Sequence, residues 1–240
     1  MAKLAESFTK TKTFCDQREL IINTSKTQFI IFKSPRRKLL EGIEIVLDGI
    51  AIQPSPHVKL LGLTLDRHLT FGEHLDLITR KCNGTIGMLA RAAPRLPRDL
   101  LRTAYVAMIR THLEYASAAF FSASKTQLAK LDVVQRKAAR VICRAPRDSH
   151  AEPLLALLQL EPLEVRRKAH VVKIIDAILD KNSHPTLESF FPLNPDGSVT
   201  NDSSTRTSTG KKRFSIAERD VFNNNLQALT RVLGHHELRG

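Results

Sequence analysis

The spacing of the apolar residues changes once along the chain, near Thr70, and this change limits the folds that are open to it. Before Thr70, short runs of Ile, Val and Leu are separated by turn residues, a pattern typical of strands. After it, apolar residues recur every three or four positions up to about residue 181, as they do in amphipathic helices. The sequence therefore predicts an α+β fold, in which a small, mostly antiparallel sheet is followed by an α-helical bundle.

The first 69 residues are predicted to contain one helix, ending at about Arg18, and then three strand-forming regions. We expect the first hairpin to pair residues 20–23 with 28–32. The second surrounds Asp48-Gly49, because Asp-Gly between apolar runs is a strong hairpin signal. The third run, residues 58–65, is interrupted by Gly62, whose missing side chain permits a bulge or a close backbone approach.

The helical region carries its own start signals. Thr70 and Glu73 form a capping-box pattern, Pro97 suits the first turn of a second helix, and Ser124 with Gln127 is predicted to cap a third. Two further helices are expected at about 152–159 and 162–181. The apolar face of the first helix is predicted to contain Phe71, Leu75, Ile78, Cys82, Ile86 and Leu89.

Four regions follow from these patterns. Residues 1–69 form the sheet region and residues 70–183 the bundle. Residues 184–215 are rich in Pro, Ser and Thr, which predicts a flexible polar loop. Residues 216–240 are expected to form a C-terminal helix.

The net charge is +13, and most of it lies in one region. Between Ile78 and Arg147 there are fourteen lysines and arginines against three acidic residues, a net charge of +11. A run of like charges is often a solvated helix face. Because this excess covers three successive helices, we favour a polyanionic partner, with nucleic acid as the first candidate.

The expected contacts are to phosphates, because the chain has no Trp and is only 5% aromatic, so it offers few rings for base stacking. The best binding surface is predicted on one helix, where four cations recur at spacings of one to four residues: Arg136, Lys137, Arg140 and Arg144. Four further arginines are expected to supplement it: Arg91, Arg95, Arg98 and Arg110.

Other classes of protein are disfavoured. There is no long apolar run and no apolar leader, so we expect no membrane partner. The three cysteines, Cys15, Cys82 and Cys143, are too far apart to form a zinc site and are interpreted as reduced thiols of an intracellular protein, cytoplasmic, nuclear or both. No metal site is predicted.

Short motifs in a fixed order resemble one known family. The motifs are Phe14-Cys15, Leu20-x-x-Asn23-x-x-Lys26-Thr27, Leu61-Gly62-Leu63-x-Leu65-Asp66, His74-x-x-x-Ile78-x-x-Lys81, Leu113-Glu114-Tyr115-Ala116, Leu131-x-x-Val134-Gln135-Arg136-x-Ala138-x-Arg140-x-Ile142, Leu160-x-Pro162-Leu163-Glu164-x-Arg166-Arg167 and Lys212-x-Phe214-Ser215 with Val221-Phe222-Asn223. Their order is similar to that after the catalytic motif of LINE-type (non-LTR, jockey-like) retrotransposon reverse transcriptases. The resemblance covers nearly the whole chain.

This resemblance implies roles for the two regions. Residues 1–69 would be the end of a polymerase palm and residues 70–183 a thumb-like bundle. Lys59, Leu61 and Gly62 would belong to a primer-grip-like hairpin, although the leucines are equally explained as sheet core. Lys26 would correspond to a palm lysine near the nucleotide phosphates, whereas as a plain residue it closes a polar turn, which is the interpretation we favour.

One departure from the family matters for activity. The family holds two Mg²⁺ ions with a Tyr/Phe-Ala-Asp-Asp motif and an earlier aspartate. This sequence contains no Asp-Asp pair. We therefore expect no catalytic residues, no cofactor for this fragment and no polymerase activity from it alone.

The expected function is that of a C-terminal fragment of an RNA-directed DNA polymerase whose thumb binds the backbone of RNA or of an RNA/DNA duplex. Two alternatives stay open. The thumb could complete an active polymerase when the missing N-terminal part is supplied in trans. Alternatively, the chain could be a domesticated or decayed helical interaction protein whose charge maintains solubility. In either case Arg166 and Arg167 are expected to neutralise Glu161 and Glu164 and not to join the binding surface.

Overall fold

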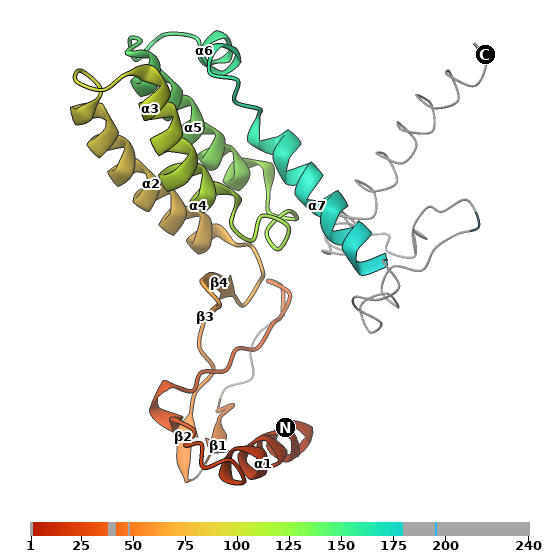
Figure 1. Ribbon diagram of the computed structural model, residues 1–240. Coiled ribbons are helices and arrows are strands. Elements are labelled where there is room, and N and C mark those ends of the chain that lie inside the picture. Colours follow the sequence, from red (N-terminus) through yellow and green to blue (C-terminus); the bar gives the residue numbers. More distant parts are fainter. Residues whose placement is uncertain (1, 38–41, 48, 180–194, 196–240) are drawn as a thin grey trace. The chain divides into compact units, whose positions relative to one another are not determined.

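A computed structural model describes residues 2–37, 42–47, 49–179 and 195 (Figure 1). The chain divides into two compact units between His74 and Leu75, and each is described by itself. The first contains short strands and one long helix, and the second is helical, which confirms the α+β prediction. The loop expected at 184–215, apart from Pro195, and the helix expected at 216–240 lie outside the described residues.

The first unit opens with the predicted helix α1 (Ala2–Asp16). The hairpin expected after it is wrong. The side chain of Asn23 accepts a hydrogen bond from the Lys26 N–H at 3.1 Å and closes a 3₁₀ turn, η1 (Thr24–Lys26). Residues 28–32 pair elsewhere, since the carbonyl of Phe29 accepts from the Ser55 N–H at 2.8 Å.

The Asp-Gly hairpin is confirmed as β1 (Ile45–Leu47) paired antiparallel with β2 (Ile50–Ile52). Gly49 adopts a φ of 77°, which a residue with a side chain rarely adopts. Ile45 and Leu47 are buried while Val46 is exposed, so β1 alternates as a strand with one solvated face does.

Residues 57–66 form a second hairpin, β3 (His57–Leu60) with β4 (Leu63–Asp66). The apolar pattern predicts one interrupted run here, whereas the resemblance implies a hairpin. Leu61 and Gly62 connect the strands with φ values of 46° and 86°, the left-handed pair that a two-residue hairpin turn requires. The expectation of one sheet is also corrected, because the described strands form two separate two-stranded sheets. Pro54 and Pro56 lie between β2 and β3 and carry no N–H for a shared ladder.

A carboxylate organises the turn after β4. Asp66 accepts hydrogen bonds from the backbone N–H groups of His68, Thr70 and Phe71 at 2.7–3.1 Å, and from the Thr70 hydroxyl. Glu73 does not act as the reciprocal partner of a capping box, since its carboxylate lies 3.1 Å from His57 Nδ1. The helix start was therefore predicted correctly, but Asp66 supplies most of its stabilising contacts.

The described part of the second unit is a helical bundle. It consists of α2 (Gly72–Ala92), α3 (Arg98–Tyr105), a π-helical turn η2 (Val106–Arg110), α4 (Thr111–Glu114), α5 (Lys125–Cys143), α6 (Ala151–Leu157) and α7 (Leu163–Leu179). Helix α5 packs against α3, α6 and α7, and α4 packs against α7 (Figure 1). All six residues predicted for the apolar face of the first helix are buried.

Helices α3 and α4 form one continuous segment that is interrupted by η2. Four large residues of this segment, each four positions after the last, are fully buried: Leu101, Tyr105, Ile109 and Leu113. The Cys82 thiol of α2 contacts the Ile109 carbonyl at 3.9 Å, so α2 packs beside the π-helical turn.

Ion pairs connect α7 to the bundle. Arg166 makes two hydrogen bonds to the Glu114 carboxylate, one of them 3.0 Å long, and another to Glu161. Arg167 is buried 3.6 Å from Asp132. The expected neutralisation of Glu161 by Arg166 is thus present, but Arg167 pairs with Asp132. Among the described helices, none is both long and apolar enough to cross a membrane.

Candidate nucleic-acid interface

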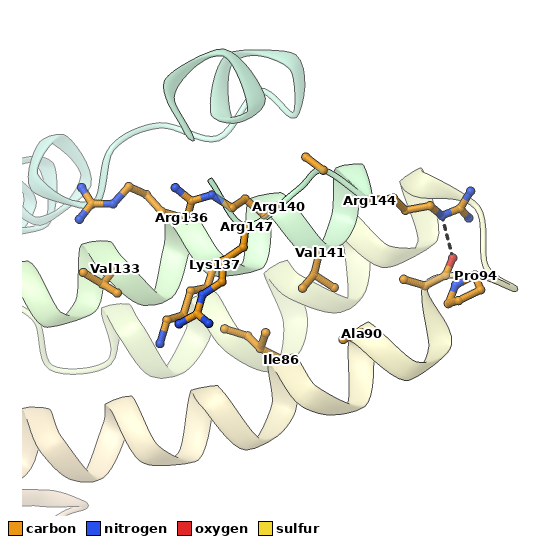
Figure 2. Close-up of a pocket in the computed structure, with 12 residues that line it drawn as sticks. Ile86, Ala90, Pro94, Val133, Arg136, Lys137, Arg140, Val141, Arg144 and Arg147 are labelled. Carbon is orange, nitrogen blue, oxygen red and sulfur yellow. Dashed lines mark hydrogen bonds between the residues drawn. The ribbon is translucent and has the colours of Figure 1, made fainter. Parts of the chain in front are cut away.

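Helices α2 and α5 run in the same direction along the most basic part of the chain. Asp76 near the start of α2 pairs with Lys130 in the first half of α5, and Ala93 after the end of α2 is bonded to Arg144 at the end of α5. A groove with a volume of about 920 Å³ lies between the two helices (Figure 2).

The groove has an aliphatic floor and a cationic rim. Figure 2 shows Ile86 and Ala90 of α2 facing Val133 and Val141 of α5, with the arginines along the α5 side. Its full lining is Ile86, Ala90, Ala93, Pro94, Val133, Val141 and Ala145 together with Arg136, Lys137, Arg140, Arg144 and Arg147. None of these lining residues is acidic and none is aromatic. The four cations predicted for the binding surface are therefore brought together here, with Arg147 as a fifth.

Arg144 is engaged in holding the bundle. Its Nε donates to the Ala93 carbonyl at 2.9 Å and its Nη2 to the Leu96 carbonyl at 2.8 Å. Arg144 also ends α5 in the left-handed conformation, with φ 53°. Both carbonyls follow the end of α2, where unpaired backbone acceptors need donors. The geometry thus gives Arg144 a structural task besides the phosphate contact that the sequence predicts.

Arg140 is engaged in a similar way. Its Nε donates to the Ser149 carbonyl at 2.9 Å, and its side chain is half-buried. This bond connects α5 to the segment before α6. The Nε of Arg140 is therefore engaged, and only the other N–H groups of its guanidinium are available to a ligand in the groove.

The remaining groove cations are available to a ligand. Within the described part of the chain, the side chains of Arg136, Lys137 and Arg147 form no hydrogen bond or ion pair. Arg147 was counted in the basic region but was not predicted as a site residue. Arg147 reaches the groove because the chain changes direction at Arg144, which has a left-handed backbone conformation. The sequence gives no sign of this conformation at an arginine.

The supplementary arginines divide into two sets. Arg91, Arg95 and Arg98 are exposed, but they do not line the groove. Arg110 lies 3.8 Å from Glu114 and lines a separate hollow with Arg166. The structure therefore does not bring Arg110 to the predicted surface.

The site residues of the first unit lie at turns and strand surfaces. Lys26 is exposed and ends the 3₁₀ turn η1. Lys59 is exposed on β3, and Leu61 and Gly62 form the turn of the second hairpin, where Leu61 is 85% exposed. Leu61 therefore does not pack in the core of the first unit.

Carboxylates are not gathered for metal binding in the described residues, where no cluster of three His, Cys, Asp or Glu side chains could hold an ion. No catalytic step is assigned to these residues. Burial would raise the pKa of Asp66, but hydrogen bonds from Thr70, His68 and Phe71 outweigh it and lower this pKa below its usual value.

The chain is similar to a transposon protein. It is 28% identical over 180 residues, or 73% of its length, to a probable RNA-directed DNA polymerase from transposon BS of Drosophila melanogaster. It spans about a fifth of that relative, since the match covers 20% of the relative's length. No described protein family and no solved structure matches the chain. The similarity supports a relationship to reverse transcriptases of transposable elements.

Proposed function

We propose that the chain is a C-terminal part of a LINE-type, jockey-like reverse transcriptase, and that its helical unit binds the sugar-phosphate backbone of RNA or of an RNA/DNA duplex. The observation that carries the proposal is the groove between α2 and α5, which gathers five cations and no carboxylate. The similarity to the transposon polymerase supports the relationship to reverse transcriptases. The order of the motifs in the sequence supports the palm-and-thumb division.

Electrostatics favours a polyanion at this groove. Cations that share one groove repel one another, and phosphates relieve this repulsion while they release counterions. Arg136 and Arg140 are four residues apart, which separates them by about 6 Å along the helix axis. Such a row can contact successive groups of one backbone.

We expect the unpaired cations of the groove to make the contacts to phosphates. Arg136, Lys137 and Arg147 can turn their full hydrogen-bonding capacity towards a ligand, because no described acidic side chain competes for them. Arg140 and Arg144 contribute charge, but each already donates to a backbone carbonyl.

A salt titration with two matched variants tests the proposal. The full chain is mixed with a fluorescent RNA/DNA duplex, and its affinity is measured by anisotropy over a range of salt concentrations. The first variant replaces Arg136, Lys137 and Arg147 by Ala. The control replaces three cations outside the groove, Lys125, Lys168 and Lys173, and so removes the same charge.

We expect the slope of log affinity against log salt to become shallower by about 2–3 in the groove variant, since each phosphate contact contributes about 0.7–0.9. The control should keep nearly the slope of the unmodified chain. Equal slopes in the two variants would show that only net charge matters and would refute the groove as the binding site.

A further inference from the structure

The floor of the α2–α5 groove has a composition that phosphate binding does not explain. Ala90 of α2 and Val133 and Val141 of α5 present aliphatic surface between the cations, beside the buried Ile86 (Figure 2). Val133 is 39% exposed, and it lies in the part of the bundle that carries most of the positive charge. An open apolar strip beside cations is unfavourable in water unless a ligand covers it.

Nucleic acid makes little use of such a floor. Its phosphates seek the cations, and its bases stack on aromatic rings, none of which line this groove. An amphipathic helix uses both features, because its apolar face fills a hydrophobic groove while its acidic residues reach the basic rim.

We propose that the α2–α5 groove docks an acidic amphipathic helix from a protein partner. The groove extends along α5 from Val133 to the C-cap Arg144, eleven positions and therefore about 16 Å, which suits a bound helix of about three turns. Leucine-like residues at positions i, i+4 and i+7 of that helix cover Val133 and Val141. Its Glu and Asp residues pair with Arg136, Lys137 and Arg147.

Charge complementarity selects this partner. All five charged side chains of the groove are cationic, so a neutral or basic helix would leave them uncompensated. The docking does not depend on nucleic-acid binding by the chain. Where both ligands are present they compete, since they share the same cations.

A designed peptide tests the docking on the full chain. The peptide has fourteen residues, with Leu at positions 2, 5, 6, 9, 12 and 13 and Glu elsewhere except for Ala at the ends. A scrambled peptide of the same composition lacks the helical spacing of Leu. The protein variants are Val133→Ser in the groove and Val165→Ser on α7, where Val165 is 52% exposed and outside the groove.

The patterned peptide is expected to bind at least tenfold more tightly than the scrambled one. Val133→Ser should weaken its binding by roughly five- to tenfold, as loss of one buried apolar side chain predicts, whereas Val165→Ser should have no effect. The affinity for the RNA/DNA duplex is measured in parallel for both variants, so that the two binding activities are compared separately.

Four outcomes overturn the inference. Equal binding of the two peptides, or full binding by Val133→Ser, would show that charge alone is recognised. An equal loss of duplex and peptide affinity in Val133→Ser would assign the floor to nucleic acid. A dimer of the unmodified chain that Val133→Ser dissociates would show that a second copy covers the groove.

Discussion

The guanidinium of Arg144 donates a hydrogen bond from Nε to the carbonyl of Ala93 at 2.9 Å, and so joins the C-terminal ends of α5 and α2. The two helices run in parallel, so their unpaired carbonyls gather at the same end of the groove. A cation there also interacts favourably with both helix dipoles.

Arg144→Ala is expected to destabilise the helical unit by about 1–3 kcal/mol, because two carbonyl contacts made by a charged donor are lost. Arg144→Gly should cost about 1 kcal/mol less, since glycine adopts the left-handed φ of this position without strain. Urea unfolding of the two variants measures the difference. If both variants lost the same stability, the left-handed conformation would not be strained in the native chain.

Glu114→Gln is expected to destabilise the bundle by about 2 kcal/mol, since the half-buried Arg166 would lose its charged partner between α4 and α7. The matched control is Glu164→Gln, which removes the surface ion pair with Lys168 and should cost less than about 0.5 kcal/mol. Thermal unfolding compares them. Similar midpoints for the two variants would contradict a structural role for Glu114.

Acid is expected to weaken the turn after β4. The folded state lowers the pKa of Asp66 below its ordinary 3.8, so its contribution is present above that pH and is lost as the pH falls through the folded value. Asp66→Asn should cost about 1–2 kcal/mol at neutral pH and progressively less below about pH 4. Thermal midpoints from pH 7 to pH 3 give the comparison. A constant difference between the two proteins would exclude the carboxylate charge as its cause.

Cys82 is expected to resist alkylation in the folded chain. Burial raises the pKa of its thiol to about 11, although Lys81 opposes the shift. At pH 8 only about one Cys82 side chain in a thousand is then a thiolate, the reactive form. Maleimide should modify the partly exposed Cys15 first, and all three cysteines in guanidinium chloride. Mass spectrometry of the peptides identifies the sites, and early modification of Cys82 would mean that α2 separates readily from η2.

The elements that could be predicted from the sequence are those set by local chemistry. Helix α2 follows from an apolar period sustained over five turns, and the β1–β2 hairpin from Asp48-Gly49. The hairpin expected at 20–32 was wrong because Asn23 offers the backbone a competing local hydrogen bond. The apolar pattern gave no turn between β3 and β4, since Leu61 has a positive φ that leucine rarely adopts, although the resemblance implied a hairpin there.

The candidate site was predictable only where it depends on local spacing along one helix. Spacing along α5 brought Arg136 and Lys137 to one surface, and the structure adds the aliphatic floor between them. The engagement of Arg140 and Arg144 by carbonyls depends on which helix ends meet in space. Sequence spacing contains no such information, so whether these two arginines contact phosphates stays a prediction.

The π-helical turn η2 makes the bundle sensitive to the length of the chain. In a plain α-helix, a spacing of four residues advances about 40° beyond one full turn, so residues 101, 105, 109 and 113 would spiral away from a common face. The wider turn at Val106–Arg110 absorbs this advance and keeps all four side chains in phase. Inserting one residue there would rotate everything that follows by about 100° and would turn Glu114 away from Arg166. Deleting one residue would convert the π-helical turn into an α-helical one and leave the following residues in phase, so a deletion there should be better tolerated than an insertion.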